Sequence, residues 1–151
     1  MNLLTTRRLT KTIVKRRQDN YSDTAGKEID KFFSLYESGQ VLDAVDSIYS
    51  SNKWILQKKD EVQNVKSQLQ NLTSLVGEFH SKVKLGEEHI AERLYHISYL
   101  ALYERQPVRL EFVFYKPKEN WVIYSFSFDD EIDEELEKFA RDKIAGYNVG
   151  S

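Results

Sequence analysis

The chain contains no cysteine among its 151 residues, which excludes disulfide bonds and thiol catalysis. It also lacks any run of about 18–20 apolar residues, the length that a membrane-spanning helix needs. The formal net charge is −2 at pH 7, so there is no overall electrostatic basis for binding nucleic acid or an anionic membrane. Apolar residues make up 40% of the chain and charged residues 30%, a composition that is typical of one ordinary globular domain.

The motifs of several site classes are missing as well. The three histidines, His80, His89 and His96, do not follow a metal-binding spacing, and there is no HExxH motif. We find no glycine-rich phosphate loop, no GxSxG motif and no dinucleotide fingerprint. The sequence therefore predicts neither a metal nor a cofactor.

Charge is unevenly distributed along the chain. Residues 1–18 carry six basic side chains and no acid, whereas residues 129–137 carry seven acids and no base. We expect residues 1–26 to be a basic, flexible arm, since blocks of like charge are usually solvated tails. The arm lacks the apolar region of a secretory signal, which favours a cytoplasmic protein, although its Arg- and Thr-rich composition weakly resembles a transit peptide. A missing or misread leader would instead indicate export.

Helical periodicity dominates the first half of the domain, which we place at residues 27–145 with a frayed tail at 146–151. Apolar residues at helical spacing predict three helices, near residues 29–36, 41–49 and 60–79. Gly39 is placed to end the first helix, and Asp60 to cap the third. Between the second and third we expect Trp54, Ile55 and Leu56 to form a buried connector. The seam of the third helix, from Val62 to Phe79, is interpreted as covering a sheet, with pairing between chains as the alternative.

Strand-like alternation follows in the second half. We predict a short strand that turns at Gly86, then strands at residues 94–104, 108–115 and 121–128. A final helix, capped by Asp129 or Asp130, carries its own apolar stripe. The residues of that stripe are Ile132, Leu136, Phe139 and Ala140.

The hairpin of residues 108–128 has one apolar face and one mixed face. Alternation assigns to the apolar, core-facing side the residues Leu110, Phe112, Phe114, Val122, Tyr124, Phe126 and Phe128. The mixed face leaves an apolar patch for a possible homodimer, made of Val113, Tyr115, Trp121 and Ile123. In residues 94–104, three tyrosines share a face beside the small residues Ser98 and Ala101, which favours a concavity. The alternative is that these rings are packed, with their hydroxyls in water at the sheet margin.

This order of elements resembles the nuclear-transport-factor-two-like superfamily, a cystatin-like α+β cone, and especially its small bacterial members of unknown function. The similarity rests on Phe32, Tyr36 and Gly39 in the opening helix and on Trp121 just after the last turn. It implies three helices packed on a curved antiparallel sheet, with a pocket at the mouth of the cone. The superfamily contains isomerases and dehydratases as well as binding modules, so the fold alone does not determine the activity.

We therefore expect an α+β binding domain without catalytic activity, which holds a small apolar or amphipathic ligand, or a protein partner, at the cone mouth or sheet face. The predicted lining residues are Trp54, Tyr95, Tyr99, Tyr103, Phe112 and Tyr124. A second hypothesis is an isomerase or dehydratase in which His96 acts as the base beside a carboxylate, Glu111 or Glu104. A third is a structural module that dimerises.

Overall fold

The computed structural model describes residues 24–149. The basic block of residues 1–18 lies outside this range. Within it, the first helix covers residues 24–37, so residues 24–26, which we had assigned to the arm, are helical. The remaining elements are α2 (Val41–Tyr49), α3 (Lys53–Gln57), α4 (Lys59–Val76), β1 (Phe79–Ile90), β2 (Leu94–Tyr103), β3 (Pro107–Tyr115), β4 (Val122–Asp129) and α5 (Ile132–Val149). This order confirms the predicted α+β class, with α3 as a further short helix before the sheet.

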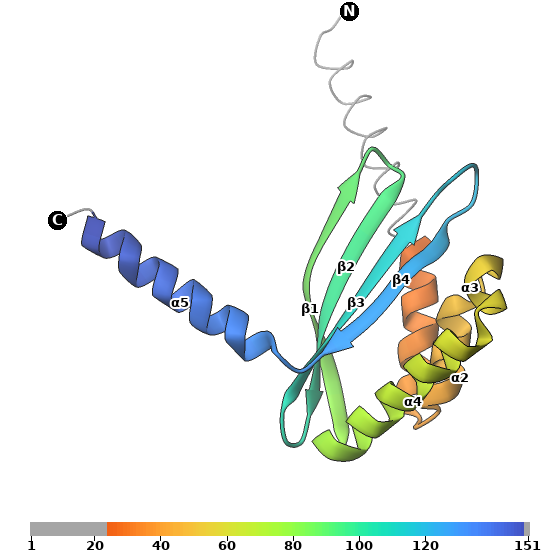
Figure 1. Ribbon diagram of the computed structural model, residues 1–151, viewed down its shortest axis with the longest axis horizontal. Helices are drawn as coiled ribbons and strands as arrows, with labels where there is room; N and C mark the ends of the chain where they lie inside the picture. The colour runs from red at the N-terminus through yellow and green to blue at the C-terminus, as the bar shows by residue number, and fades with distance from the viewer. Residues whose placement is uncertain (1–23, 150–151) are drawn as a thin grey trace, which may run out of the picture.

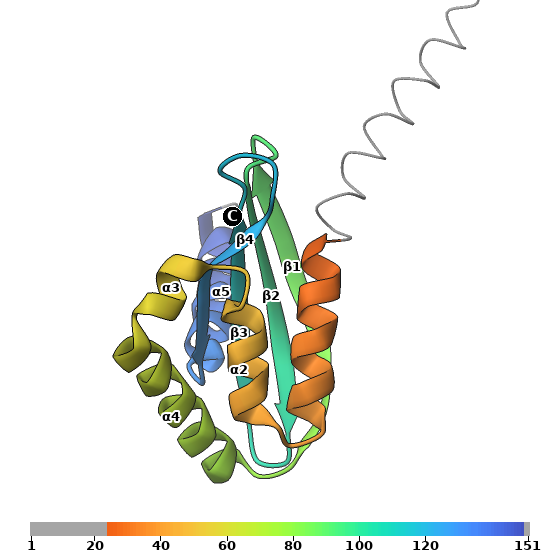
Figure 2. The ribbon, with the colours of Figure 1, turned by 90° about the vertical axis from the view of Figure 1, so that its right-hand side faces the viewer.

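The sheet is an antiparallel meander in the order β1-β2-β3-β4. Figure 1 and Figure 2 show the first helix, α2 and α4 on one side of this twisted sheet. The opposite side, called here the outer face, is where α5 leaves the sheet and extends away from the body (Figure 1). The helices therefore cover one face and leave the other open.

Aromatic rings fill the space between the helices and the sheet. The stripe predicted on the first helix is confirmed, because Ile29, Phe32, Phe33 and Tyr36 are all buried. The ring of Phe32 lies 5.2 Å from the ring centres of both Phe112 and Phe126. Side chains from the first helix, β3 and β4 thus form one core.

The first helix ends where the sequence predicted. Gly39 has a φ of +82°, which glycine adopts without steric penalty. Its amide donates to the Tyr36 carbonyl, and the amide of Gln40 donates to the Leu35 carbonyl. These two bonds satisfy the last carbonyls of the helix and allow α2 to begin at Val41.

The segment predicted as a buried connector is instead the short helix α3. The side chain of Asn52 caps it by accepting from the amides of Trp54 and Ile55, while its Nδ2 donates to the Ile123 carbonyl at 2.7 Å. Trp54 is 66% exposed and Leu56 42% exposed. The prediction of burial was wrong for Trp54 and Leu56, whereas Ile55 is partly buried against the core and Asn52 anchors the segment to β4.

Helix α4 differs from its prediction at both ends. It begins at Lys59 without a side-chain cap from Asp60, and it ends at Val76 before Gly77, whose φ is +90°. Phe79, which we assigned to the helix, is the first residue of β1. The predicted seam is buried within the chain at Val62, Leu69 and Val76, with α4 packed chiefly against α2, so this seam is not available for pairing between chains.

Strand β1 is one long strand, and the turn predicted at Gly86 is absent. Ten of its twelve residues pair with β2, and the register shifts between Phe79 and Ser81 and again between Lys84 and Gly86. The glycine therefore accommodates a bulge within a strand and does not end one.

A bulge between β3 and β4 inverts part of the predicted hairpin pattern. Phe112 pairs with Phe126, but the register shifts between Val113 and Phe114, so that Phe114 pairs with Ile123. Ile123 is consequently buried in the core, and Tyr124 is 63% exposed. Strict alternation had assigned these two residues to the opposite faces.

Candidate functional site

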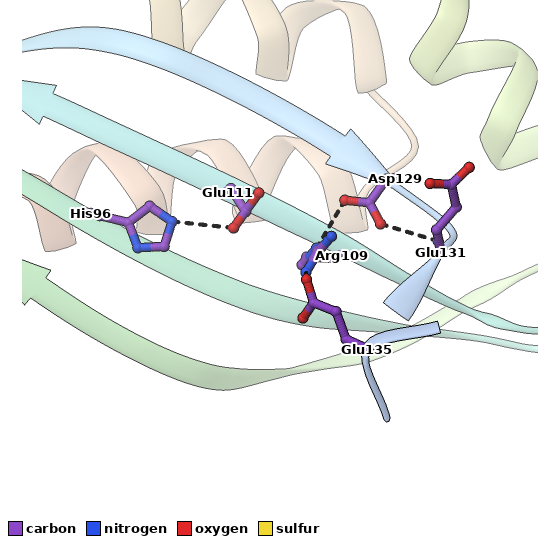
Figure 3. A network of polar contacts seen from close by, with 6 residues as sticks. All are labelled: His96, Arg109, Glu111, Asp129, Glu131 and Glu135. Carbon is purple, nitrogen blue, oxygen red and sulfur yellow. Dashed lines mark hydrogen bonds and ion pairs between the residues drawn. The ribbon is translucent and has the colours of Figure 1, made fainter. Parts of the chain in front are cut away.

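Polar side chains gather on the outer face of the sheet (Figure 3). Strand pairing places Ser98 of β2 opposite Glu111 of β3, with His96 opposite Val113. His96 and Glu111 are thus diagonal neighbours on one face, and His96 Nε2 lies 3.2 Å from Glu111 Oε1. Both side chains remain partly open to solvent, at 41% and 30% exposure.

Arg109 forms two ion pairs on this face. Its Nε donates to Asp129 Oδ2 at 2.8 Å and its Nη1 to Glu135 Oε1 at 2.5 Å. The hydrogen bond to Asp129, followed by the one to Glu135, raises the pKa of the Arg109 guanidinium. Because Asp129 ends β4 and Glu135 lies in the first turn of α5, Arg109 ties the start of α5 to the sheet.

The junction before α5 is further fixed by Asp129 itself. Its Oδ1 accepts from the amide of Glu131 at 3.1 Å (Figure 3). One carboxylate therefore binds the Arg109 side chain and the backbone that leads into the helix, which is the local turn role that aspartate often has.

These side chains surround a hollow of about 420 Å³, within the usual size range of small-molecule sites. We call it the outer hollow. Its lining residues are Leu85, Gly86, Glu87, Glu88, His96, Ser98, Arg109, Glu111, Ile132 and Glu135. Of the four glutamates, Glu135 is paired with Arg109, and the carboxylate of Glu87 is bonded to Tyr95 and Lys84. The carboxylates of Glu88 and Glu111 remain. The outer hollow is therefore acidic, with apolar contacts at Leu85 and Ile132.

A smaller hollow of about 240 Å³ lies between α4 and the edge strand β4. Its lining residues are Tyr49, Ile55, Lys58, Glu61, Val62, Val65, Tyr124, Ser125 and Phe126. Burial raises the pKa of the Tyr49 phenol to about 12. This hollow contains Tyr124, the one predicted ligand-binding residue that lines either of the two hollows.

The other predicted lining residues lie elsewhere. Tyr95, Tyr103 and Phe112 are buried in the core, and Tyr99 packs against Phe33; exposed Trp54 lines neither hollow. Ser98 lines the outer hollow instead, and the rings of the first helix pack against Tyr99 and Phe112.

The tyrosine hydroxyls find partners within the protein. Those of Tyr36 and Tyr103 are hydrogen-bonded to each other, and Tyr95 donates to Glu87. The Tyr95 hydrogen bond, aided by Lys84, holds the pKa of Glu87 below its ordinary value. Because these hydroxyls are satisfied internally, they are not directed into a ligand site.

Of the two carboxylates considered as partners for His96, the structure brings only Glu111 to it. Glu104 lies after the end of β2, where its side chain would be 3.0 Å from a Cβ added at Gly77. Sequence reasoning missed Glu88 and Glu135 as site residues. Arg109 and Glu111 could have been found from the sequence, because two charged residues on the mixed face of a strand predict a polar site there.

Comparisons with known proteins give no family assignment: no family model, curated protein or solved structure matches the chain. Among residues 24–149, no group of three or more His, Asp or Glu side chains is arranged to hold a metal ion. None of the helices in the described range is long and apolar enough to cross a bilayer.

Proposed function

We propose that the chain is a non-catalytic binding domain that holds a small amphipathic cation in the outer hollow. The observation that carries this proposal is that the carboxylates of Glu88 and Glu111 border a space of small-molecule size. Arg109 does not offset these two carboxylates, because its guanidinium is already engaged by Asp129 and Glu135.

The arrangement favours a primary amine with a short alkyl chain. An ammonium group donates three hydrogen bonds and accepts none, which matches the carboxylate oxygens of Glu88 and Glu111. The alkyl chain would contact Leu85 and Ile132, which border the same hollow. A carboxylate or phosphate ligand would meet like charge here, so the site discriminates against anions.

Titration with hexylamine tests the proposal, with hexanol and hexanoate as probes of equal chain length. We expect hexylamine to shift the backbone amide resonances of His96 and Ser98, and added salt to weaken binding. Glu111→Gln should weaken it about tenfold, the usual effect of losing a hydrogen bond to a charged group. Glu119→Gln, an exposed change in the β3–β4 turn, is the matched control.

Two results would overturn the proposal. One is that hexanol or hexanoate binds the outer face as well as hexylamine does. The other is that Glu119→Gln weakens binding as much as Glu111→Gln, since the carboxylates of the hollow would then have no special role.

The contact between His96 and Glu111 supports a second candidate, an enzyme that abstracts a proton next to a carbonyl group. With the proton on Nε2 donated to Glu111, the Nδ1 atom of His96 would be the free base. Deuterium exchange into a panel of simple ketones tests this function. Exchange that follows a bell-shaped pH profile and is lost in His96→Ala would support catalysis, whereas no exchange above the buffer rate would rule it out.

A further inference from the structure

The helix α5 presents an apolar stripe that nothing in the described chain covers. Its large apolar side chains are exposed by 62–83%, namely Leu136, Phe139, Ile144 and Tyr147. Figure 1 shows the helix extending away from the sheet, attached at its first turn. At 3.6 residues per turn these residues fall on one side of the helix, together with Ile132 and Ala140.

A helix of this kind needs a partner to be stable. It has 18 residues, and most of the stability of a helix in a protein comes from packing of its apolar face. The contact between Arg109 and Glu135 stabilises only the first turn. The four exposed side chains lie beyond that turn.

From these observations we infer that α5 pairs with α5 of a second copy of the chain in antiparallel orientation. Charge along the helix determines the orientation. Within α5, residues 132–137 carry four acids and no base, whereas residues 138–149 carry three bases and one acid. Antiparallel pairing brings the acidic half of each helix beside the basic half of the other, and parallel pairing would bring like charges together.

Lys143 gives a second indication of the same orientation. It falls in the middle of the apolar stripe, between Phe139 and Tyr147. In a parallel pair it would meet the partner's Lys143. In the antiparallel pair, with Phe139 beside the partner's Ala140, it lies across from the partner's Leu136, where acidic residues flank the stripe on both sides.

The same register places the partner's Tyr147 beside Ile132, which lines the outer hollow. It also leaves the two bodies at opposite ends of a helix pair roughly 27 Å long, so they do not collide. Folding α5 back over its own sheet is less favourable, because that would bring its acidic half over Glu88 and Glu111. Dimerisation does not depend on ligand binding in the outer hollow.

Sedimentation of the full chain over a range of concentrations tests the pairing. We expect a reversible monomer–dimer equilibrium that Leu136→Gln/Phe139→Gln weakens about 100-fold, from the loss of two large apolar contacts in each helix. The matched control is Glu134→Gln/Arg141→Gln, which places two glutamines on the opposite side of α5 and should leave the dimer intact. A chain that stays monomeric, or a dimer that resists the stripe variant, would overturn the inference.

Cross-linking tests the orientation, and the absence of native cysteine makes it specific. Ala140→Cys lies next to the two-fold axis of the antiparallel pair and should form an intermolecular disulfide on mild oxidation. Gly146→Cys should not, because its two copies would be roughly 20 Å apart, too far for a disulfide. An added Cβ at Gly146 meets nothing within 4 Å, so the change itself is harmless. Equal cross-linking of both variants would indicate a parallel pair and contradict the inference.

Discussion

The first helix and α5 have similar sequence patterns and opposite surroundings. Both carry apolar residues at intervals of three and four, yet Phe32 is fully buried and Phe139 is 63% exposed. The first helix lies against the sheet, and α5 extends away from it (Figure 1). A helical period therefore shows that a stripe exists, but not what covers it.

The connections at the helix ends explain the difference. Gly39 and Gly77 both have positive φ values, and they turn the chain so that successive elements pack on one another. Before α5, Asp129 and Arg109 hold the chain on the outer face, where the sheet offers acidic side chains in place of apolar ones. The apolar face of the sheet is already filled by the first helix and α2.

The largest effect on stability should come from removing a ring of the first helix, whereas removing the matching ring of α5 should have little effect. Phe32→Ala should lower the free energy of unfolding by about 3–5 kcal/mol, because it leaves a cavity in the core. Phe139→Ala should change it by less than about 0.5 kcal/mol in the monomer. Urea unfolding at low protein concentration measures both, and similar losses would show that α5 packs on the body.

A smaller effect should follow from adding a methyl group at the turn after α4. Gly77→Ala should destabilise the fold by about 1–3 kcal/mol, since its φ is positive and a Cβ there would lie 2.9 Å from Glu104 Oε2. Gly86→Ala is the control: a Cβ there meets nothing within 4 Å, so the change should stay within about 0.5 kcal/mol. Thermal unfolding separates the two, and equal shifts would mean that Gly77 is not needed to turn α4 onto the core.

The anchor of α5 can be tested with two arginines. Arg109→Gln should cost about 1–2 kcal/mol, because two carboxylates lose a largely buried partner, and amide exchange in the first turn of α5 should become faster. Arg141→Gln removes an exposed ion pair with Glu137 at 3.5 Å and should cost less than about 0.5 kcal/mol. Unchanged exchange in Arg109→Gln would show that α5 is held by other contacts.

The smallest expected effect is on the pH dependence of folding stability. Because the folded-state pKa of Glu87 is below its ordinary value of 4.5, Glu87 stabilises the fold above that pH, and this contribution is lost as the pH falls through the folded-state pKa. Tyr95→Phe should shrink this acid-dependent loss by about 0.5 kcal/mol, a small amount because Glu87 is 41% exposed. Stability curves at several pH values measure the change. Tyr124→Phe, at an exposed ring, serves as the control, and an equal change there would contradict this role of Tyr95.

Much of the architecture could be predicted from local pattern. The stripe of the first helix, the turn at Gly39, the strand from Leu94 and the hairpin after Pro107 all follow from the period of apolar residues. Within the sheet, the errors occurred where one residue shifts a register. The bulges beside Gly86 and Tyr124 change which side chains face the core, and a bulge depends on pairing with a strand that is distant in sequence.

The candidate site was predictable only in part. His96 and Glu111 were recognised as a possible pair, and the structure places them 3.2 Å apart. The residues predicted to line an aromatic pocket lie apart from both hollows, except Tyr124, and side chains of the first helix pack against Tyr99 and Phe112. No pattern within β2 could indicate this packing, because the side chains involved belong to the first helix.

The sequence by itself determined the α+β class, the apolar stripes of the helices and most of the strand pattern, because these depend on side-chain periodicity over neighbouring residues. The tertiary structure alone decided which stripes are covered, which face of β4 enters the core, and that Arg109, Glu111 and Glu135 meet around one hollow. These features depend on the register of the strands and on which elements pack on a shared surface. Both involve contacts between residues far apart in the chain.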